Sequence, residues 1–131
     1  MKVWGVAVGG ALGAVLRWWL GEAFPDGAGF PWTTFAINVT GAGVLAGLPA
    51  LAVVRRRPEL AAALGPGVLG GYTTLSAYSE QTRALLADDR VATGAAYVLG
   101  TLVACLLVVS VVSRFTTPAA RREFEAEGGD E

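Results

Sequence analysis

The sequence predicts an all-α membrane protein with four membrane-spanning helices, the third of them broken near its middle. Hydrophobic residues make up 53% of the 131 residues, and the mean hydropathy is +0.52, which fits a small, single-domain integral membrane protein. Glycine and proline interrupt the third apolar stretch, which predicts the break. The four stretches lie at about 3–21, 33–54, 60–87 and 93–113, so we expect one four-helix domain over residues 1–115.

The composition excludes several kinds of chemistry. The chain has no histidine, and its single cysteine, Cys105, lies in an apolar run. We therefore expect no histidine acid–base catalysis, no intrachain disulfide and no Cys/His metal cluster. The net charge of -1 favours neither a nucleic acid nor a polyanionic partner. An enzyme is not expected.

The first span carries a stripe of small residues along one helix face. The residues that recur at every fourth position are Gly5, Gly9, Gly13, Arg17 and Gly21. Small residues at this spacing let another helix approach closely, because lipid offers no hydrophobic drive for helix association. Arg17 lies beside Trp18 and Trp19, which suit the membrane interface. It is either a snorkelling anchor or a buried residue that faces structure or an anion.

The second span places two polar residues on one face, because Thr34 and Asn38 are four residues apart. An asparagine at membrane depth is costly unless it makes a hydrogen bond. Hydrogen bonding between helices and the lining of a polar path both remain open.

The third span contains the least helix-compatible stretch, which begins Gly65-Pro66-Gly67. Pro66 lacks a backbone donor, and each glycine weakens a helix by about 1 kcal/mol relative to alanine. Carbonyls freed at membrane depth are tolerated only where something satisfies them. With Thr73, Thr74 and Ser76 nearby, the break predicts a small-ion site built from backbone and hydroxyl groups. A kinked helix packed by glycines is the alternative.

The fourth span, about 93–113, places Tyr97, Thr101 and Cys105 on one stripe. The residues that follow, 116–131, are charged and glycine-ended, which predicts a disordered tail.

Four spans put both termini and the loop after the second span on one side of the membrane. That side carries Lys2, Arg55, Arg56, Arg57, Arg114, Arg121 and Arg122, against at most Arg17, Arg83 and Arg90 on the other. The positive-inside rule therefore predicts cytoplasmic termini and one orientation.

Three segments in this order and setting resemble the CrcB, or Fluc, family of fluoride channels. They are GGALGAVLR at 9–17, TFAINVTG at 34–41 and GGYTTLSAY at 70–78, and the resemblance covers about residues 5–112. It implies a subunit that exports fluoride passively across the plasma membrane and relieves fluoride toxicity. It further implies an antiparallel dimer of four-helix subunits around a structural sodium ion, held by the backbone carbonyls of Gly70 and Thr73.

The resemblance also implies a fluoride pathway along the subunit interface. Asn38 would donate its amide to the anion, and Ser76 and Thr101 would supply hydroxyl groups. The other expected pathway residues are Thr34 beside Asn38, Tyr97 on the fourth span, Arg17 near the entrance, and Leu75 and Tyr78, which occupy the positions of two anion-boxing phenylalanines in the family.

Leu75 and Tyr78 depart from the family, because leucine has no polarised aromatic edge and tyrosine adds a hydroxyl group. Together with the charge bias, they predict a heterodimer with a homologous, oppositely oriented subunit that bears the phenylalanines; a working homodimer is the alternative. A small multidrug antiporter would need a membrane-embedded glutamate, and no acidic residue precedes Glu22. A non-conducting structural partner subunit also remains open.

Overall fold

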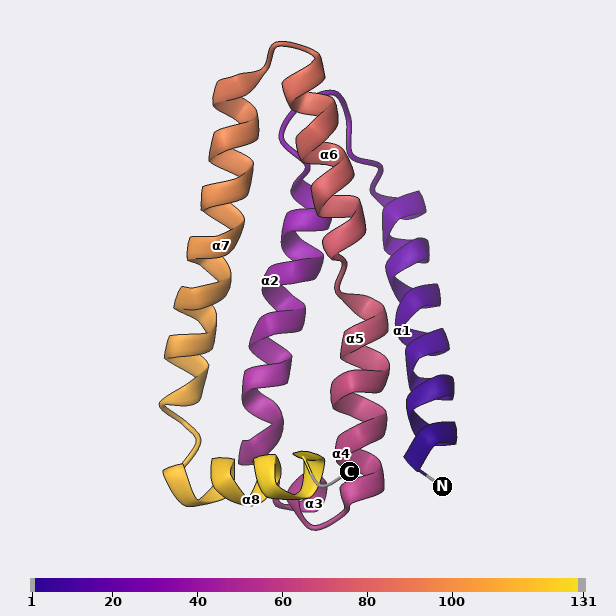
Figure 1. Cartoon of the computed structure of the whole chain (residues 1–131), viewed down its shortest axis with the longest axis vertical. Helices are drawn as coiled ribbons and strands as arrows, with labels where there is room; N and C mark the ends of the chain where they lie inside the picture. Colours follow the sequence, from indigo (N-terminus) through magenta and orange to yellow (C-terminus); the bar gives the residue numbers. More distant parts are fainter. Residues whose placement is uncertain (1, 130–131) are drawn as a thin grey trace.

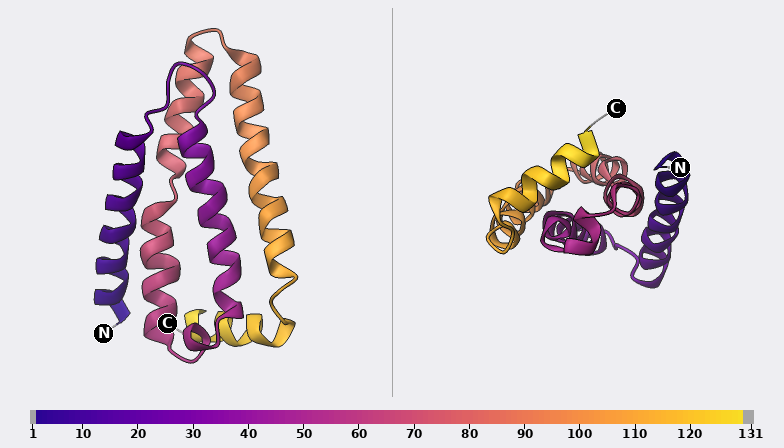
Figure 2. Two further views of the ribbon diagram at one scale, coloured as in Figure 1. Left: turned by 180° about the vertical axis from the view of Figure 1, so that it is seen from behind. Right: turned by 90° about the horizontal axis from the view of Figure 1, so that it is seen from below.

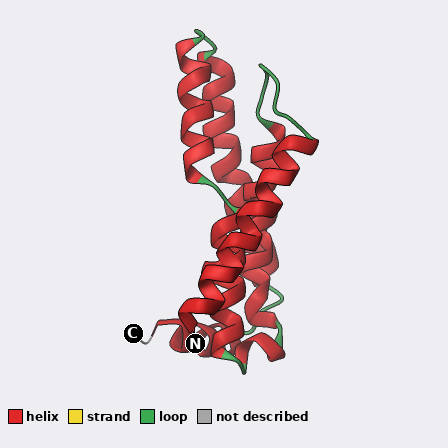
Figure 3. Cartoon of the chain, turned by 90° about the vertical axis from the view of Figure 1, so that its right-hand side faces the viewer, coloured by secondary structure: helices red, strands yellow, loops and turns green. Residues whose placement is uncertain are grey.

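The structure, a computed structural model, describes residues 2–129, and all of its regular elements are helices (Figures 1 and 3). In chain order these elements are α1 (Lys2–Ala23), α2 (Trp32–Gly47), the 3-10 turn η1 (Leu48–Ala50), α3 (Ala52–Arg55), α4 (Pro58–Ala62), the π-helical segment η2 (Ala63–Leu69), α5 (Gly70–Tyr72), α6 (Leu75–Ala87), α7 (Val91–Ser113) and α8 (Pro118–Gly129). The all-helical prediction is therefore confirmed for the part of the chain that the structure describes.

Three helical stretches are long and apolar enough to cross a membrane. They are Lys2–Ala23, Trp32–Ala50 and Val91–Ser113. Large apolar side chains on them point outward; Leu106 and Leu107 of α7, for example, are 58% and 61% exposed. In water so much exposed apolar surface would be unfavourable, whereas in lipid it is the expected covering. The chain is thus a multi-pass membrane protein.

A composite segment follows the short α3, running through α4, η2, α5 and α6. Pro66 lies inside η2, where the wider π-helical turn accommodates a residue that cannot donate a backbone hydrogen bond. The helical path is interrupted between α5 and α6, where Thr73 and Thr74 have extended backbone dihedrals (ψ 157° and 120°). That this segment crosses the membrane as a fourth span stays a prediction.

The small residues of α1 allow it to pack directly on the backbone of η2 and α5. A Cβ atom on Gly9 would collide with the carbonyl of Ala63, and one on Gly13 would collide with the carbonyl of Val68. The predicted close approach of another helix is confirmed at these two positions. Gly21, the last glycine of the stripe, has no neighbour within 4 Å of such an atom, so the close contact ends before it.

On the other side of the composite segment, α2 lies along α7, and α6 also contacts α7 (Figure 1). At the loop end of these helices the ring of Phe30 packs edge-on against the ring of Tyr97, with centroids 5.3 Å apart. At the opposite end, a small apolar cluster contains Leu48, Val54 and Leu69. The break between α5 and α6 lies between these two packed ends.

The expectation of a disordered tail over 116–131 is wrong for residues 118–129, which form α8; residues 130–131 lie outside the described part. Thr117 starts the helix, because its Oγ1 accepts the amide of Ala120 at 3.2 Å. Phe124 then packs against the apolar cluster, and Glu123 pairs with Arg55 at 3.1 Å. As a result α8 lies across one end of the bundle (Figures 1 and 2).

Candidate functional site

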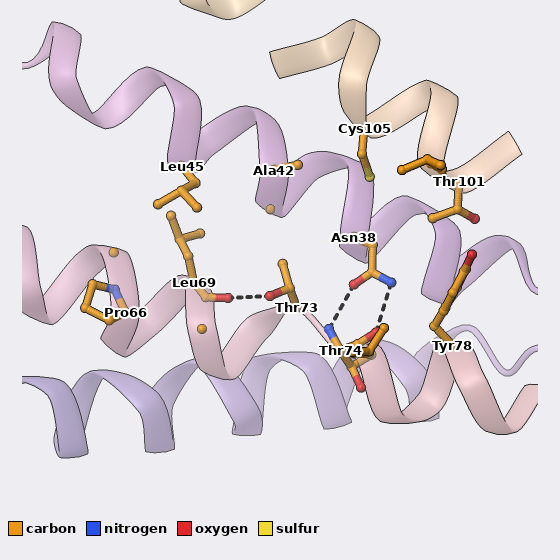
Figure 4. A pocket seen from close by; sticks show the side chains of 15 residues that line it. Asn38, Ala42, Leu45, Pro66, Leu69, Thr73, Thr74, Tyr78, Thr101 and Cys105 are labelled. Carbon is orange, nitrogen blue, oxygen red and sulfur yellow. Dashed lines mark hydrogen bonds between the residues drawn. The ribbon is translucent and has the colours of Figure 1, made fainter. Parts of the chain in front are cut away.

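An open groove of about 680 Å³ lies along α2, the composite segment and α7 (Figure 4). Apolar side chains form most of its wall, and the polar groups gather around the break between α5 and α6. The predicted site residues that line it are Asn38, Gly70, Thr73, Leu75, Tyr78 and Thr101. The structure therefore brings six of the ten sequence-predicted residues to one surface.

Asn38 is bound to the break by two hydrogen bonds to the backbone of Thr74 (Figure 4). Its Oδ1 accepts the amide of Thr74 at 2.8 Å, and its Nδ2 donates to the carbonyl of Thr74 at 3.1 Å. The side-chain amide thus replaces the helix bond that the break removes from the amide of Thr74, and it adds a second bond to the carbonyl of the same residue. An asparagine nitrogen carries two N–H groups, so one donor of Asn38 remains for a ligand in the groove.

The break also releases backbone carbonyls from their helical partners. In a continuous helix the amide of Thr74 would bond the carbonyl of Gly70, and that of Ala77 would bond the carbonyl of Thr73. Here the first amide bonds Asn38, and the second bonds Oγ1 of Thr74 at 3.1 Å. Gly70 and Thr73 both line the groove, so their carbonyls are the acceptors that the break makes available.

The hydroxyl groups in the groove already donate to helix carbonyls. Tyr78 donates to the carbonyl of Val98 at 3.1 Å, and Thr101 donates to the carbonyl of Tyr97 at 2.6 Å. Tyr78 is thereby fixed against α7 and forms part of the groove wall. Leu75 is 76% exposed, and Ser76 is exposed without lining the groove.

A second cavity, of about 320 Å³, lies on the other side of the break. Arg17 and Thr34 line it, and Thr74 lines both cavities. The Nε atom of Arg17 donates to the carbonyl of Gly71 at 3.2 Å. The guanidinium group therefore contacts the segment at the break, about one turn from Thr74, and leaves its remaining N–H donors for other partners.

Sequence reasoning missed a polar network in the lining of this cavity, formed by Asp26 and Gln81. The carboxylate of Asp26 accepts the amide of Thr33 at 2.7 Å and the hydroxyl of Thr34 at 3.0 Å. Gln81 donates to both Asp26 and Thr34, and its Oε1 accepts the hydroxyl of the fully buried Tyr97 at 2.8 Å. Asp26 satisfies the start of α2 from seven residues away, beyond the reach of the local capping rule.

The two cavities differ in what they can bind. The second combines the guanidinium group of Arg17 and threonine hydroxyl groups with two carboxylates, Glu22 and Asp26. The first offers an amide donor together with released carbonyls. Among the described residues, none of those that line the larger groove carries a carboxylate. The arrangement suits small ions that exchange water for protein groups and pass through without chemical change.

Comparison with known proteins places residues 4–113 in one family. The model described as "CrcB-like protein, Camphor Resistance (CrcB)" matches those residues. Fluoride-specific ion channel FluC 1 of Streptomyces coelicolor is 42% identical over 108 residues, covering 79% of this chain and 70% of the relative. Fluoride-specific ion channel FluC of Novosphingobium aromaticivorans is 46% identical over 106 residues, covering 76% and 82%. FluC 2 of Nocardia farcinica, also named a fluoride-specific ion channel, is 40% identical over 124 residues, covering 89% and 88%.

Proposed function

The chain belongs to the CrcB-like family, and from that premise we propose that it is a subunit of a fluoride-selective channel. Such a channel lets fluoride leave the cell passively and relieves fluoride toxicity. The observation that carries the proposal is the Asn38–Thr74 junction between the two cavities, in a chain whose relatives are named fluoride-specific ion channels. The resemblance to the family is confirmed. The chain is therefore an ion-channel subunit and not an enzyme.

The route runs past the break. Fluoride is small and strongly hydrated, so it enters only where close donors replace its water. The spare N–H of Asn38 lies on one side of Thr74 and the guanidinium group of Arg17 on the other. Hydroxyl hydrogens rotate freely, so Thr34 in the second cavity and Thr101 in the groove turn toward the anion as it passes. Tyr97 is fully buried, and it acts on the route by holding Gln81, which bonds Thr34. Ser76 is exposed on the first turn of α6 and faces a partner subunit.

The composite segment is the fourth span, and its break is a sodium site. The released carbonyls of Gly70 and Thr73 are hard oxygen donors, which fit an alkali or alkaline-earth cation. Two oxygens do not fill the coordination shell of such a cation, so an antiparallel partner completes it. A fixed cation there adds a positive field beside the anion route.

The open groove is where the partner subunit docks. Its wall is mostly apolar, and Leu75 stands 76% exposed at its edge. The partner is a homologous, oppositely oriented chain that supplies the aromatic edges that Leu75 and the α7-bound Tyr78 do not. A homodimer is the second candidate, since an antiparallel copy would present the same face. The family match removes the small multidrug antiporter from consideration.

The test is fluoride efflux from liposomes, with chloride efflux as the control for leakage. The full chain is reconstituted alone and together with the homologous subunit encoded nearest to it. We expect fluoride-selective flux only from the mixture. Flux from this chain alone would replace the heterodimer with a homodimer and leave the channel function in place. Equal fluoride and chloride flux, or no flux from either preparation, would contradict the function itself.

A further inference from the structure

A third cavity, of about 450 Å³, lies far from the break, between the end of α7 and α8. Three arginines from the two helices, Arg114, Arg121 and Arg122, share its lining with one carboxylate, Glu125, and with Thr116. The fluoride route uses none of these residues.

Thr116 has a side chain that the fold does not explain. The residue is 8% exposed, and its Oγ1 atom is buried without a hydrogen-bond partner in the described part of the chain. A buried hydroxyl group is normally paired, because leaving it unpaired costs free energy. The Thr116 hydroxyl is not needed to cap the start of α8, because Thr117 already does so. A ligand with an oxygen acceptor in the cavity would pair it.

The charged side chains around Thr116 favour an anionic ligand. Among the side chains that the structure describes, the carboxylates in ion pairs are Glu123, which binds Arg55, and Glu80, which binds Arg83. Neither pair uses an arginine of the cavity, and Glu125 is the single acid in its lining. Guanidinium groups bind phosphate through paired N–H donors, and a hydroxyl group adds a donor to the same oxygens.

The position of the cavity at the end of the bundle indicates that the phosphate belongs to a lipid. It lies where the apolar helix α7 ends, at the level of a membrane surface. Val111 and Phe115, which adjoin lining residues in the sequence, are 52% and 79% exposed, while α8 lies across the end of the bundle (Figures 1 and 2). Basic side chains next to exposed apolar ones, on a helix lying across a span, are the pattern of an interfacial segment. The cytoplasmic leaflet, where the termini are proposed to lie, is the anionic one.

We propose that this cavity binds the phosphate of an anionic phospholipid headgroup, with Thr116 and the arginines as donors and the acyl chains along Val111 and Phe115. The inference goes beyond fluoride conduction and does not depend on it. It also gives α8 a role, because this helix, held by Phe124 and the Arg55–Glu123 pair, closes a lipid site at the end of the bundle.

The experiment measures lipid binding to the purified full chain in detergent by native mass spectrometry. The probe is phosphatidylglycerol, with phosphatidylcholine as the zwitterionic lipid and inorganic phosphate as the soluble competitor. Two changes alter the site: Thr116→Val, and the double change Arg114→Gln with Arg121→Gln. The matched control is Arg56→Gln with Arg57→Gln, which removes two exposed arginines from the same end of the bundle but outside the cavity.

We expect tighter binding of phosphatidylglycerol than of phosphatidylcholine. Thr116→Val should lose affinity on the order of tenfold, as for one lost charge-assisted hydrogen bond. The double variant should lose more, because it removes two guanidinium groups. The control should bind nearly as the unchanged chain does. Thr116→Val preserves side-chain shape, so it tests the site even if the double variant folds poorly. Equal losses in the site and control variants would overturn the proposal, because they would indicate diffuse charge attraction. Displacement of the lipid by equimolar inorganic phosphate would also overturn it, assigning the site to the soluble ion.

Discussion

Asn38 shows how one side chain can make a helix break tolerable at membrane depth. Its amide satisfies both the N–H and the C=O of Thr74, at 2.8 and 3.1 Å. Without it, the amide of Thr74 would have no partner in a region without water. The same amide keeps one donor free, so the residue that stabilises the break also faces the groove. Structural and conducting roles therefore coincide at this position.

At the residue scale we predict that Asn38→Ala lowers both stability and fluoride flux. Asn38→Ala leaves the amide of Thr74 without its partner, which costs about 1–3 kcal/mol, so the free energy of unfolding in detergent should fall by about that amount. Asn38→Asp keeps the acceptor for the amide of Thr74 but places a carboxylate in the groove. It should lose less stability than Asn38→Ala and still lose flux, because the charge repels an anion.

Thr82→Val provides the control for this pair, because the Thr82 hydroxyl donates to the carbonyl of Tyr78 on its own helix and lines neither cavity at the break. It should leave flux and stability nearly unchanged. Normal flux in Asn38→Asp would contradict a route past Asn38, whereas normal stability in Asn38→Ala would contradict its role at the break.

At the scale of elements, the contact between α1 and the composite segment depends on glycine backbones. Gly13 leaves no room for a Cβ atom, which would meet the carbonyl of Val68 and the amide of Tyr72. These are main-chain atoms of a packed helix and cannot rotate away as a side chain can. Arg17 lies on the same face and donates to the carbonyl of Gly71. The helix α1 therefore packs against the segment that leads to the break.

We predict that Gly13→Ala destabilises the protein by about 1–3 kcal/mol, the usual cost of overpacking. Gly21→Ala is the matched control on the same stripe, since nothing lies within 4 Å of its added methyl group. It should be neutral or stabilising by up to about 1 kcal/mol, because alanine favours helix over glycine. Chemical unfolding followed by circular dichroism measures both. Equal effects at the two positions would mean that helix propensity, not close packing, decides the outcome.

The glycine stripe could be predicted because periodicity is a local property, whereas the partners of the polar residues are not. The sequence indicated that Asn38 needs a hydrogen bond, but only the fold places Thr74, 36 residues away, against it. The charged composition of residues 118–129 predicts a tail, whereas Phe124 and the Arg55–Glu123 pair stabilise α8 there through distant contacts. Asp26 and Gln81 escaped notice for the same reason, being 55 residues apart.

At the scale of the whole molecule, charge is distributed unequally between the two ends. The N-terminus, α3 and α8 lie at one end, which carries Arg55, Arg56 and Arg57 (Figure 1). At the other end, Arg83 is paired with Glu80 at 2.6 Å. An antiparallel homodimer needs copies inserted both ways, and a strong bias of basic residues opposes that. Orientation and the choice of partner are therefore linked.

We predict that the chain inserts one way, with Arg56 on the cytoplasmic side and Asp88 outside. In a Cys105→Ser background, single cysteines at these sites (Arg56→Cys or Asp88→Cys) are treated in intact cells with a membrane-impermeant maleimide. Asp88→Cys should label and Arg56→Cys should not, until the cells are opened. Adding Arg55→Gln and Arg57→Gln to Arg56→Cys should produce a labelled fraction, because it removes the basic loop that holds the orientation. Equal labelling of both sites in the unaltered charge background would show dual insertion, and would favour a homodimer over the mixed pair.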